Sequence, residues 1–191
     1  MYQTELRKPS LTVYCLDYSG SMAGNGVTSL RSAMSMLLDQ TKAKNYMLQA
    51  STKDVTIVIP FDNNVLDIWK AEGNDETTLL ELQSKIDSLD PQGGTDIYKP
   101  LIKAMDEIKK YNVSDYTISI ILMSDGKSNV NSYNQVVEEW NQENLDIPIF
   151  SITFGDSDDR ELQALADFST ARVFDGKDNL EKAFKQAKGY N

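Results

Sequence analysis

Short apolar runs alternate with amphipathic stretches from one end of this chain to the other. The apolar runs are rich in β-branched residues and predict strands at Leu11–Leu16, Val55–Phe61, Val65–Trp69, Thr117–Met123, Ile147–Phe154 and Arg172–Phe174. Between them, apolar residues recur at helical spacing over about Thr28–Lys42, Leu79–Leu89, Ile97–Tyr111, Tyr133–Glu143, Asp159–Phe168 and Leu180–Ala187. This order of elements predicts an α/β fold, in which helices cover both faces of a parallel sheet.

One connection departs from the parallel pattern. Only Asp62, Asn63 and Asn64 separate the second and third predicted strands. A crossover between parallel strands needs a dozen or more residues, so these two strands should pair antiparallel. The sequence therefore predicts a doubly wound, Rossmann-like sheet of six strands, mainly parallel, with one antiparallel edge strand.

Composition and length indicate one ordinary globular domain. The chain has 191 residues, of which 40% are hydrophobic and 25% charged, and nothing in it resembles a linker. We therefore expect a single domain over residues 1–191, cut from a longer protein in which other domains adjoin it.

The longest apolar run, Ile118–Met123, is far shorter than the roughly 20 residues that cross a bilayer, so this segment should not insert into a membrane. The net charge of −10 disfavours nucleic acid as a partner.

Polar residues gather where predicted strands end, at the edge of the sheet where doubly wound folds bind ligands. The first strand runs into Asp17-Tyr18-Ser19-Gly20-Ser21, a later loop reads Gly93-Gly94-Thr95-Asp96, and the fourth strand ends in Ser124-Asp125-Gly126. Asp17, Ser19 and Ser21 are two residues apart, so a turning chain can direct their oxygens to one point. Mg²⁺ prefers about six oxygen ligands, and hydroxyls with one or two carboxylates suit it.

These three segments resemble the metal-ion-dependent adhesion site of von Willebrand factor type A domains. The resemblance implies that Ser19, Ser21 and Thr95 supply oxygens to a divalent cation, Mg²⁺ or else Mn²⁺ or Ca²⁺, which Asp17 and Asp125 bind directly or through water. It further implies a binding module without enzymatic activity, whose cation grips an Asp or Glu of a partner protein. The segment Arg172–Gly176 and the residues after it are most similar to bacterial cell-envelope members, which implies an extracytoplasmic location, with a cytoplasmic one as the alternative.

Several other interpretations are open at this stage. Asp17 and Asp125 could instead serve an Mg²⁺-dependent phosphoryl transfer with Asp17 as nucleophile, although aspartate-based phosphatases carry a second Asp where this chain has Ser19. The domain could also be a scaffold that works beside an ATPase. Asp96 could cap the following helix rather than serve the metal.

Three further expectations concern single residues and one acidic loop. Tyr18 and Tyr98 are candidate contacts for the partner at the rim of the metal site, because tyrosine is frequent in interfaces. The acidic residues Asp156, Asp158 and Asp159 could hold calcium or form a solvated turn. Cys15, the only cysteine, should be a buried thiol because it lies within an apolar run.

Overall fold

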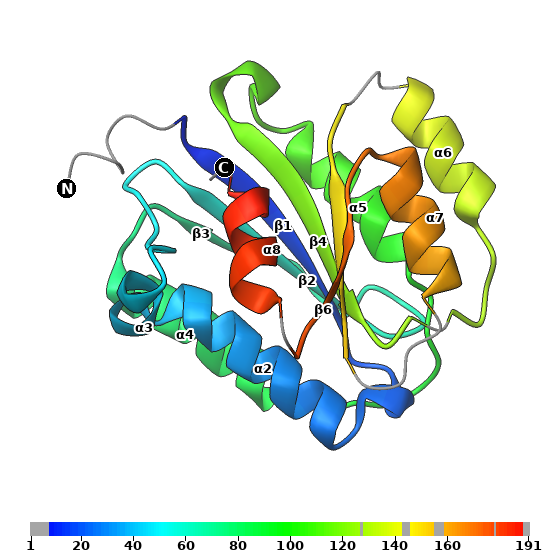
Figure 1. Ribbon diagram of the computed structural model, residues 1–191, viewed down its shortest axis with the longest axis horizontal. Helices are drawn as coiled ribbons and strands as arrows, with labels where there is room; N and C mark the ends of the chain where they lie inside the picture. Colours follow the sequence, from blue (N-terminus) through cyan, green and yellow to red (C-terminus); the bar gives the residue numbers. More distant parts are fainter. Residues whose placement is uncertain (1–7, 127, 143–145, 155–158, 178, 189–191) are drawn as a thin grey trace.

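A six-stranded sheet forms the centre of the molecule (Figure 1). The structure is a computed structural model that describes residues 8–126, 128–142, 146–154, 159–177 and 179–188. The strands lie in the order β3-β2-β1-β4-β5-β6. Their bounds are β1 Ser10–Asp17, β2 Val55–Phe61, β3 Trp69–Glu72, β4 Thr117–Ser124, β5 Ile149–Thr153 and β6 Val173–Asp175. Neighbouring strands are parallel except β2 and β3, which pair antiparallel at one edge, so the predicted fold class is confirmed.

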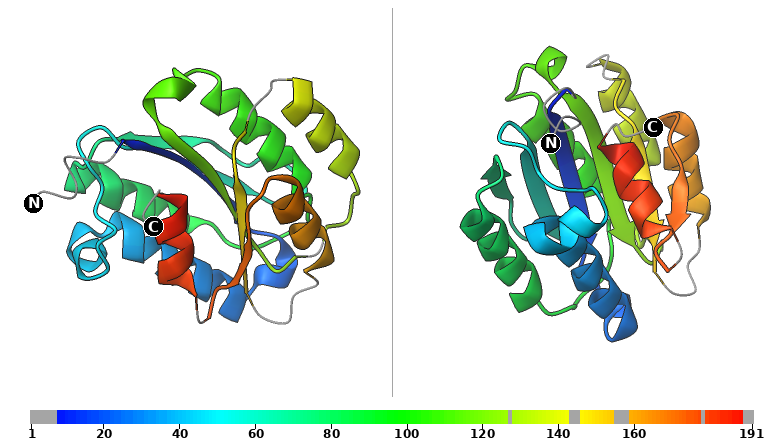
Figure 2. Two further views of the ribbon diagram at one scale, coloured as in Figure 1. Left: turned by 45° about the horizontal axis from the view of Figure 1, so that its top comes forward. Right: turned by 60° about the vertical axis from the view of Figure 1, so that its left-hand side comes forward.

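Helices cover both faces of this sheet, as Figures 1 and 2 show. One face carries α2 (Asn25–Leu38), α3 (Gln40–Asn45), α4 (Glu76–Ser88) and α8 (Leu180–Ala187), and the other carries α5 (Tyr98–Ile108), α6 (Tyr133–Gln142) and α7 (Arg160–Phe168). Two short 3₁₀ turns, η1 (Gly20–Met22) and η2 (Val113–Asp115), complete the described elements. None of the described helices combines the length and the apolar character that crossing a membrane requires.

The residues of β1 alternate between two hydrophobic cores, one on each face of the sheet. Tyr14 and Leu16 pack toward α2, α4 and α8, whereas Leu11, Val13 and Cys15 pack toward α5 and its neighbours. The side chains of successive residues in a strand point to opposite faces, so a strand buried on both sides is apolar throughout. Cys15 is fully buried, as predicted, and its burial raises the pKa of the thiol.

The predicted boundaries differ most from the structure at the antiparallel strand and at the first long helix. The antiparallel strand begins at Trp69 and not at Val65, which forms only an isolated bridge with Phe61. The Asp62 carboxylate accepts a hydrogen bond from Asn64 N–H, which closes a turn and delays the ladder. The first long helix is interrupted at Asp39, whose extended backbone ends α2 and whose carboxylate caps α3 by accepting from the N–H groups of Thr41 and Lys42.

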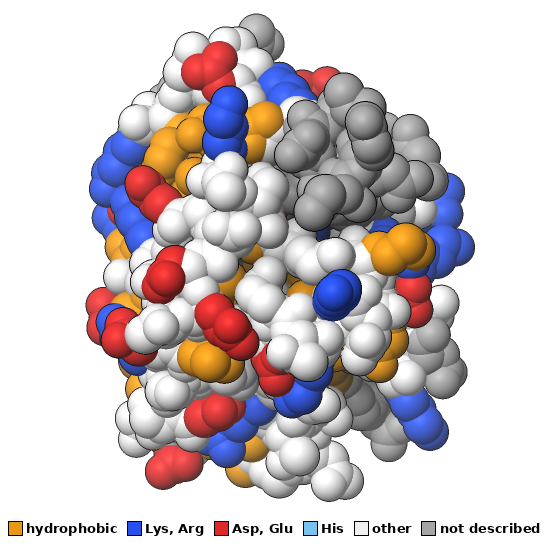
Figure 3. Space-filling view, turned by 90° about the vertical axis from the view of Figure 1, so that its left-hand side faces the viewer, with side chains coloured by type: hydrophobic (Ala, Val, Ile, Leu, Met, Phe, Trp, Pro, Cys, Tyr) orange, Lys and Arg blue, Asp and Glu red, His pale blue; other side chains and the backbone are white. Residues whose placement is uncertain are grey.

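The net charge is not concentrated on the side of the molecule where the N-terminus lies. Figure 3 shows acidic and basic side chains interspersed over that side. Mixed charges of this kind keep a surface soluble without forming a strong field of one sign. The polar loops that follow β1 and β4 lie at the opposite edge, where the parallel strands end.

Candidate metal centre

The carboxyl ends of the two central strands lie next to each other. β1 and β4 pair in parallel with Leu16 opposite Met123, so Asp17 at the end of β1 lies close to the Ser124-Asp125 end of β4. From this edge the chain leaves β1 toward α2 on one face and β4 toward α6 on the other (Figure 1). A point where consecutive connections diverge to opposite faces is where doubly wound sheets bind ligands.

Asp17 is fully buried at the base of this edge. Its Oδ1 accepts a hydrogen bond from Ser19 N–H at 2.8 Å, and its Oδ2 accepts one from the Ser124 hydroxyl at 2.6 Å. Burial raises the pKa of Asp17 to about 6, hydrogen bonds from Ser124 and Ser19 oppose the shift, and the charge of Asp125 adds to it. The carboxylate therefore holds the ends of two strands together and orients Ser19.

Ser19 and Ser21 bring their hydroxyls together above Asp17. The two Oγ atoms are 3.2 Å apart, with Ser19 buried and Ser21 exposed. The 3₁₀ turn Gly20–Met22 produces this arrangement, because it folds the chain back directly after β1. Two hydroxyl oxygens thus face one point that solvent can reach from the side of Ser21.

The Thr95 segment is fastened to both other loops. Gly20 N–H donates to Gly93 O at 3.1 Å, which joins it to the serine loop. Thr95 N–H donates to Asn129 Oδ1 at 2.7 Å, and Asn129 N–H donates back to Thr95 O at 2.8 Å, which joins it to the loop after β4. The backbone of Thr95 is thereby fixed, while its hydroxyl makes no hydrogen bond within the described residues. The structure therefore brings all five predicted metal ligands to one edge of the sheet.

Asp96 and Asp62 have structural roles at this edge. The Asp96 carboxylate accepts hydrogen bonds from Tyr98 N–H at 3.0 Å and Lys99 N–H at 3.2 Å, so it caps α5, as the sequence suggested. The backbone carbonyl of Asp62 accepts from Asp96 N–H at 2.9 Å. These contacts position the Thr95 loop against the turn after β2.

The expectation that Tyr18 and Tyr98 are exposed contacts for a partner is wrong. Tyr18 is 0% exposed and its hydroxyl donates to Ile86 O, so the side chain points into the core beneath the metal loop. Tyr98 is 1% exposed and its hydroxyl donates to Glu161. Alternation along the chain explains the first error, because Tyr18 points to the opposite side from its neighbours Asp17 and Ser19.

Of the acidic residues after β5, Asp156 and Asp158 lie outside the described residues, and Asp159 is exposed at the start of α7.

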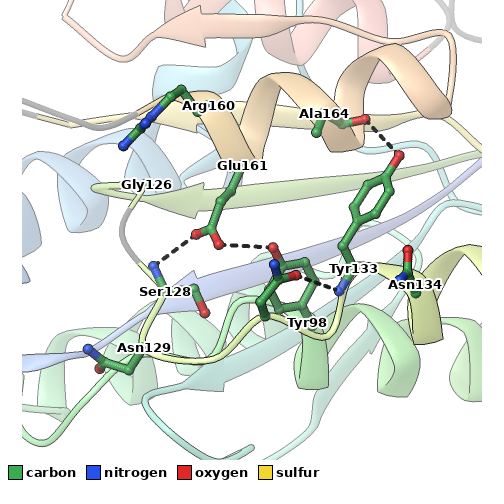
Figure 4. Close-up of a pocket in the computed structure, with 10 residues that line it drawn as sticks. Tyr98, Gly126, Ser128, Asn129, Tyr133, Asn134, Arg160, Glu161 and Ala164 are labelled. Carbon is green, nitrogen blue, oxygen red and sulfur yellow. Dashed lines mark hydrogen bonds between the residues drawn. The ribbon is translucent and has the colours of Figure 1, made fainter.

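A pocket of about 660 Å³ opens beside the loop after β4 (Figure 4). Its lining includes Gly126, Ser128 and Asn129 from that loop, together with Tyr98 and Glu161. Sequence reasoning missed Ser124 and Asn129, which form hydrogen bonds with Asp17 and Thr95, and Glu161, which accepts from Ser128 N–H in the loop after β4. No local pattern identifies them, because each bonds to a residue more than thirty positions away.

This set of side chains is suited to a hard cation. The candidate donors are three hydroxyls and two carboxylates, and oxygen atoms of these kinds are ligands of Mg²⁺ and Mn²⁺. Within the described part of the chain, no three His, Cys, Asp or Glu side chains come together to bind a metal. A cation at this edge would therefore depend on serine and threonine hydroxyls for much of its coordination. The paired hydroxyls of Ser19 and Ser21 fit that requirement, as does the Thr95 hydroxyl, which no described residue engages in a hydrogen bond.

Solved structures of other proteins share this fold. A von Willebrand factor type A protein from Catenulispora acidiphila aligns with a TM-score of 0.73 at 17% identity over 96% of this chain, which spans only 43% of that protein. An aerotolerance-related membrane protein from Bacteroides fragilis aligns with a TM-score of 0.66 at 14% identity, over 95% of this chain and 100% of the other. Proximal thread matrix protein 1 from the mussel byssus, solved with a zinc-occupied metal-ion-dependent adhesion site, aligns with a TM-score of 0.62 at 17% identity over 94% of this chain and 47% of its own.

Sequence comparison identifies the family. A search of curated proteins found no match. The model of the von Willebrand factor type A domain matches residues 12–171, which include most of β1 and all three loops of the candidate metal centre. This chain belongs to the von Willebrand factor type A domain family.

Proposed function

We propose that this domain binds a divalent cation, Mg²⁺ in the first place, and uses it to hold an acidic residue of a partner protein. Ser19, Ser21, Thr95, Asp17 and Asp125 would hold the cation. The observation that carries the proposal is the approach of the Ser19 and Ser21 hydroxyls to 3.2 Å at the edge where the Thr95 and Asp125 loops also meet. The zinc-occupied adhesion site of the mussel byssus protein, which has the same fold, adds support.

The five candidate ligands would leave one coordination position of the cation open. Mg²⁺ takes about six oxygen ligands, so a carboxylate from a partner can complete the shell. Asp17 keeps the Ser19 backbone in place from below, and Ser21 lies on the exposed side, where a partner can approach. These roles favour an adhesion or interaction module.

The environment of Asp17 argues against phosphoryl transfer. A nucleophilic carboxylate must be reachable by a phosphoryl group, which is much larger than a bare cation. Asp17 is 0% exposed, and Ser19 and Ser124 lie against its carboxylate and donate to it. We therefore retain the non-catalytic function.

Calorimetric titration of the chelator-treated protein with Mg²⁺, Mn²⁺ and Ca²⁺ tests metal binding. We expect one site in the wild-type protein and none in Asp125→Ala or in the double variant Ser19→Ala, Ser21→Ala. Asp146→Ala, which removes an exposed carboxylate elsewhere, should bind like the wild type. A flat titration of folded wild-type protein with all three cations would refute the proposal.

Acetate can serve as a probe of the open position. Protein-bound Mn²⁺ enhances the relaxation of water protons through the water molecules that it exchanges with solvent. If a carboxylate enters the coordination shell, added acetate should lower this enhancement in a saturable manner. Acetate that leaves the enhancement unchanged at saturation with Mn²⁺ would separate metal binding from carboxylate recognition and refute the latter.

A further inference from the structure

Glu161, in the first turn of α7, contacts both the loop after β4 and the first residue of α5, which line the pocket in Figure 4. Its Oε2 accepts a hydrogen bond from Ser128 N–H at 3.1 Å, and its Oε1 accepts one from the Tyr98 hydroxyl at 3.1 Å. Ser128 lies three residues after Asp125, and Tyr98 lies three residues after Thr95. One carboxylate thus connects two of the segments that carry candidate metal ligands.

The helix that carries Glu161 is firmly anchored. Leu162 and Leu165 of α7 are 0% exposed in the core between α7 and the sheet. The loop that Glu161 contacts is far less buried, since Ser128 is only partly buried and Asn129 is exposed. The hydrogen bond to Ser128 N–H therefore ties a surface loop to a rigid element.

The contacts continue from this loop to Thr95. Asn129, the next residue after Ser128, exchanges two hydrogen bonds with the backbone of Thr95, at 2.7 and 2.8 Å. The Ser128 hydroxyl also lies 3.4 Å from Thr95 O. A displacement of Ser128 would therefore be transmitted to Thr95 as well as to Asp125.

We propose that Glu161 is a positioning residue of the metal centre, which sets the metal affinity by holding the Asp125 and Thr95 loops in register. The inference rests on the proposed function. Hydrogen-bond partners of ligand-bearing groups typically change metal affinity by about 10–100-fold when removed. Glu161 is expected to act in this way from α7, an element that contributes none of the five candidate ligands.

Two variants separate geometry from charge. Gln in place of Glu161 can accept from Ser128 N–H with its carbonyl oxygen and donate from its amide to the Tyr98 hydroxyl, so it preserves both contacts without the charge. Ala preserves neither. If Glu161 acts through position, Glu161→Ala should weaken Mn²⁺ binding by about tenfold or more and Glu161→Gln should bind nearly as the wild type does. Tyr98→Phe, which removes one of the two contacts, should lie between them.

Calorimetric titration with Mn²⁺ measures these differences, with Glu81→Ala and Glu81→Gln as controls. Glu81 is an exposed residue of α4 on the opposite face of the sheet. Equal losses in Glu161→Ala and Glu161→Gln would show that only the charge matters and would overturn the proposal. So would a wild-type affinity in folded Glu161→Ala.

Hydrogen exchange in chelator tests the positioning without any metal. Glu161→Ala should speed exchange of the backbone N–H groups of Ser128, Asn129 and Thr95, while those of the buried strand β1 keep their wild-type rates. Unchanged exchange at these three residues refutes the role of Glu161 even if the wild type binds metal. A wild type that binds no metal refutes the proposed function, and with it the effect of Glu161 on affinity.

Discussion

Burial of the ionised Asp17 carboxylate destabilises the metal-free fold, and a bound cation would relieve this destabilisation. Its folded pKa of about 6 lies above the ordinary value of 3.8. Between these pH values the Asp17 carboxyl is therefore largely protonated in the folded protein and largely ionised in the unfolded chain. For a carboxyl group with a raised pKa, the stabilising contribution is complete below about pH 4 and is lost as the pH rises to about 6. Metal-free protein should therefore lose up to about 3 kcal/mol from this residue between these pH values.

Asp17→Asn tests this cost directly. In chelator at pH 7.5, the variant should have a higher free energy of unfolding than the wild type, because the amide is uncharged and can still contact Ser19 and Ser124. At pH 4 the advantage should disappear. Urea titrations at both pH values measure the difference, with Asp146→Asn as the control for loss of one exposed negative charge. An Asn variant that is no more stable at pH 7.5 would contradict the prediction.

Gly94 leaves room for the Asn129 side chain. A Cβ atom at Gly94 would lie 2.7 Å from Asn129 Oδ1, the atom that accepts from Thr95 N–H. Gly94→Ala should therefore break this hydrogen bond, at a cost of about 1 kcal/mol, and weaken Mn²⁺ binding. In Gly26→Ala the added methyl group meets only the flexible Met22 side chain, and both quantities should stay near the wild type. Thermal melts in chelator measure the stability of both variants, and titrations measure their Mn²⁺ affinity. Unchanged metal affinity in Gly94→Ala would count against the prediction.

At the scale of the elements, α8 is secured at its C-terminal end by a buried lysine. Lys188 is 6% exposed; its Nζ donates to Leu48 O at 3.0 Å and lies 4.0 Å from Asp54 Oδ2. The Ser119 hydroxyl of β4 donates to Ala187 O at 2.8 Å. These contacts join the last helix to the sheet and to the segment before β2.

Lys188→Met should therefore be costly although methionine fills a similar volume. The change leaves the Leu48 carbonyl and the Asp54 carboxylate buried without this cationic neighbour, at a cost of about 1–3 kcal/mol. Lys182→Met, on an exposed position of the same helix, should change the stability by at most about 0.5 kcal/mol. Denaturant unfolding of both variants measures the contrast. Similar stabilities for the two would show that the buried ammonium contributes nothing specific.

At the scale of the whole molecule, two hydrophobic cores share one sheet, and each contains one of the two tryptophans. Trp69 lies in the core beneath α2 and α4, and Trp140 lies in the core between α6 and the sheet. Because β1 and β4 contribute side chains to both cores, neither core can be exposed without disrupting the other. The described part of the chain should therefore unfold as one cooperative unit.

Single-tryptophan variants report on each core separately. Fluorescence of Trp140→Phe follows Trp69, and fluorescence of Trp69→Phe follows Trp140. Adding Leu30→Ala, in the first core, or Leu101→Ala, in the second, should cost about 2–5 kcal/mol. Each of these two substitutions should lower the free energy of unfolding by the same amount whether Trp69 or Trp140 reports the unfolding. Destabilisation seen only by the tryptophan on the affected side would show that the cores unfold independently.

The local sequence determined the fold class, and the resemblance of three loops to the adhesion site of von Willebrand factor type A domains supplied the candidate ligands. The period of the apolar residues distinguishes strands from helices, and the short Asp62–Asn64 connection forces an antiparallel pair. Parallel strands end at one edge, so polar loops that are distant in sequence could be assigned to one site in advance. Boundaries were less accurate: side-chain hydrogen bonds of Asp39 and Asp62 stop or delay an element where hydrophobic periodicity alone would continue it.

Tertiary structure alone decided which residues surround those ligands and which are accessible. The hydroxyls of the buried Tyr18 and Tyr98 donate to the Ile86 carbonyl of α4 and to Glu161 of α7, and the residues of the metal loops do not reveal these distant partners. The same is true of the Ser124, Asn129 and Glu161 contacts, which join residues 33 to 107 positions apart. A hydrogen bond needs its two atoms within about 3 Å, and that proximity arises only when the whole chain has folded.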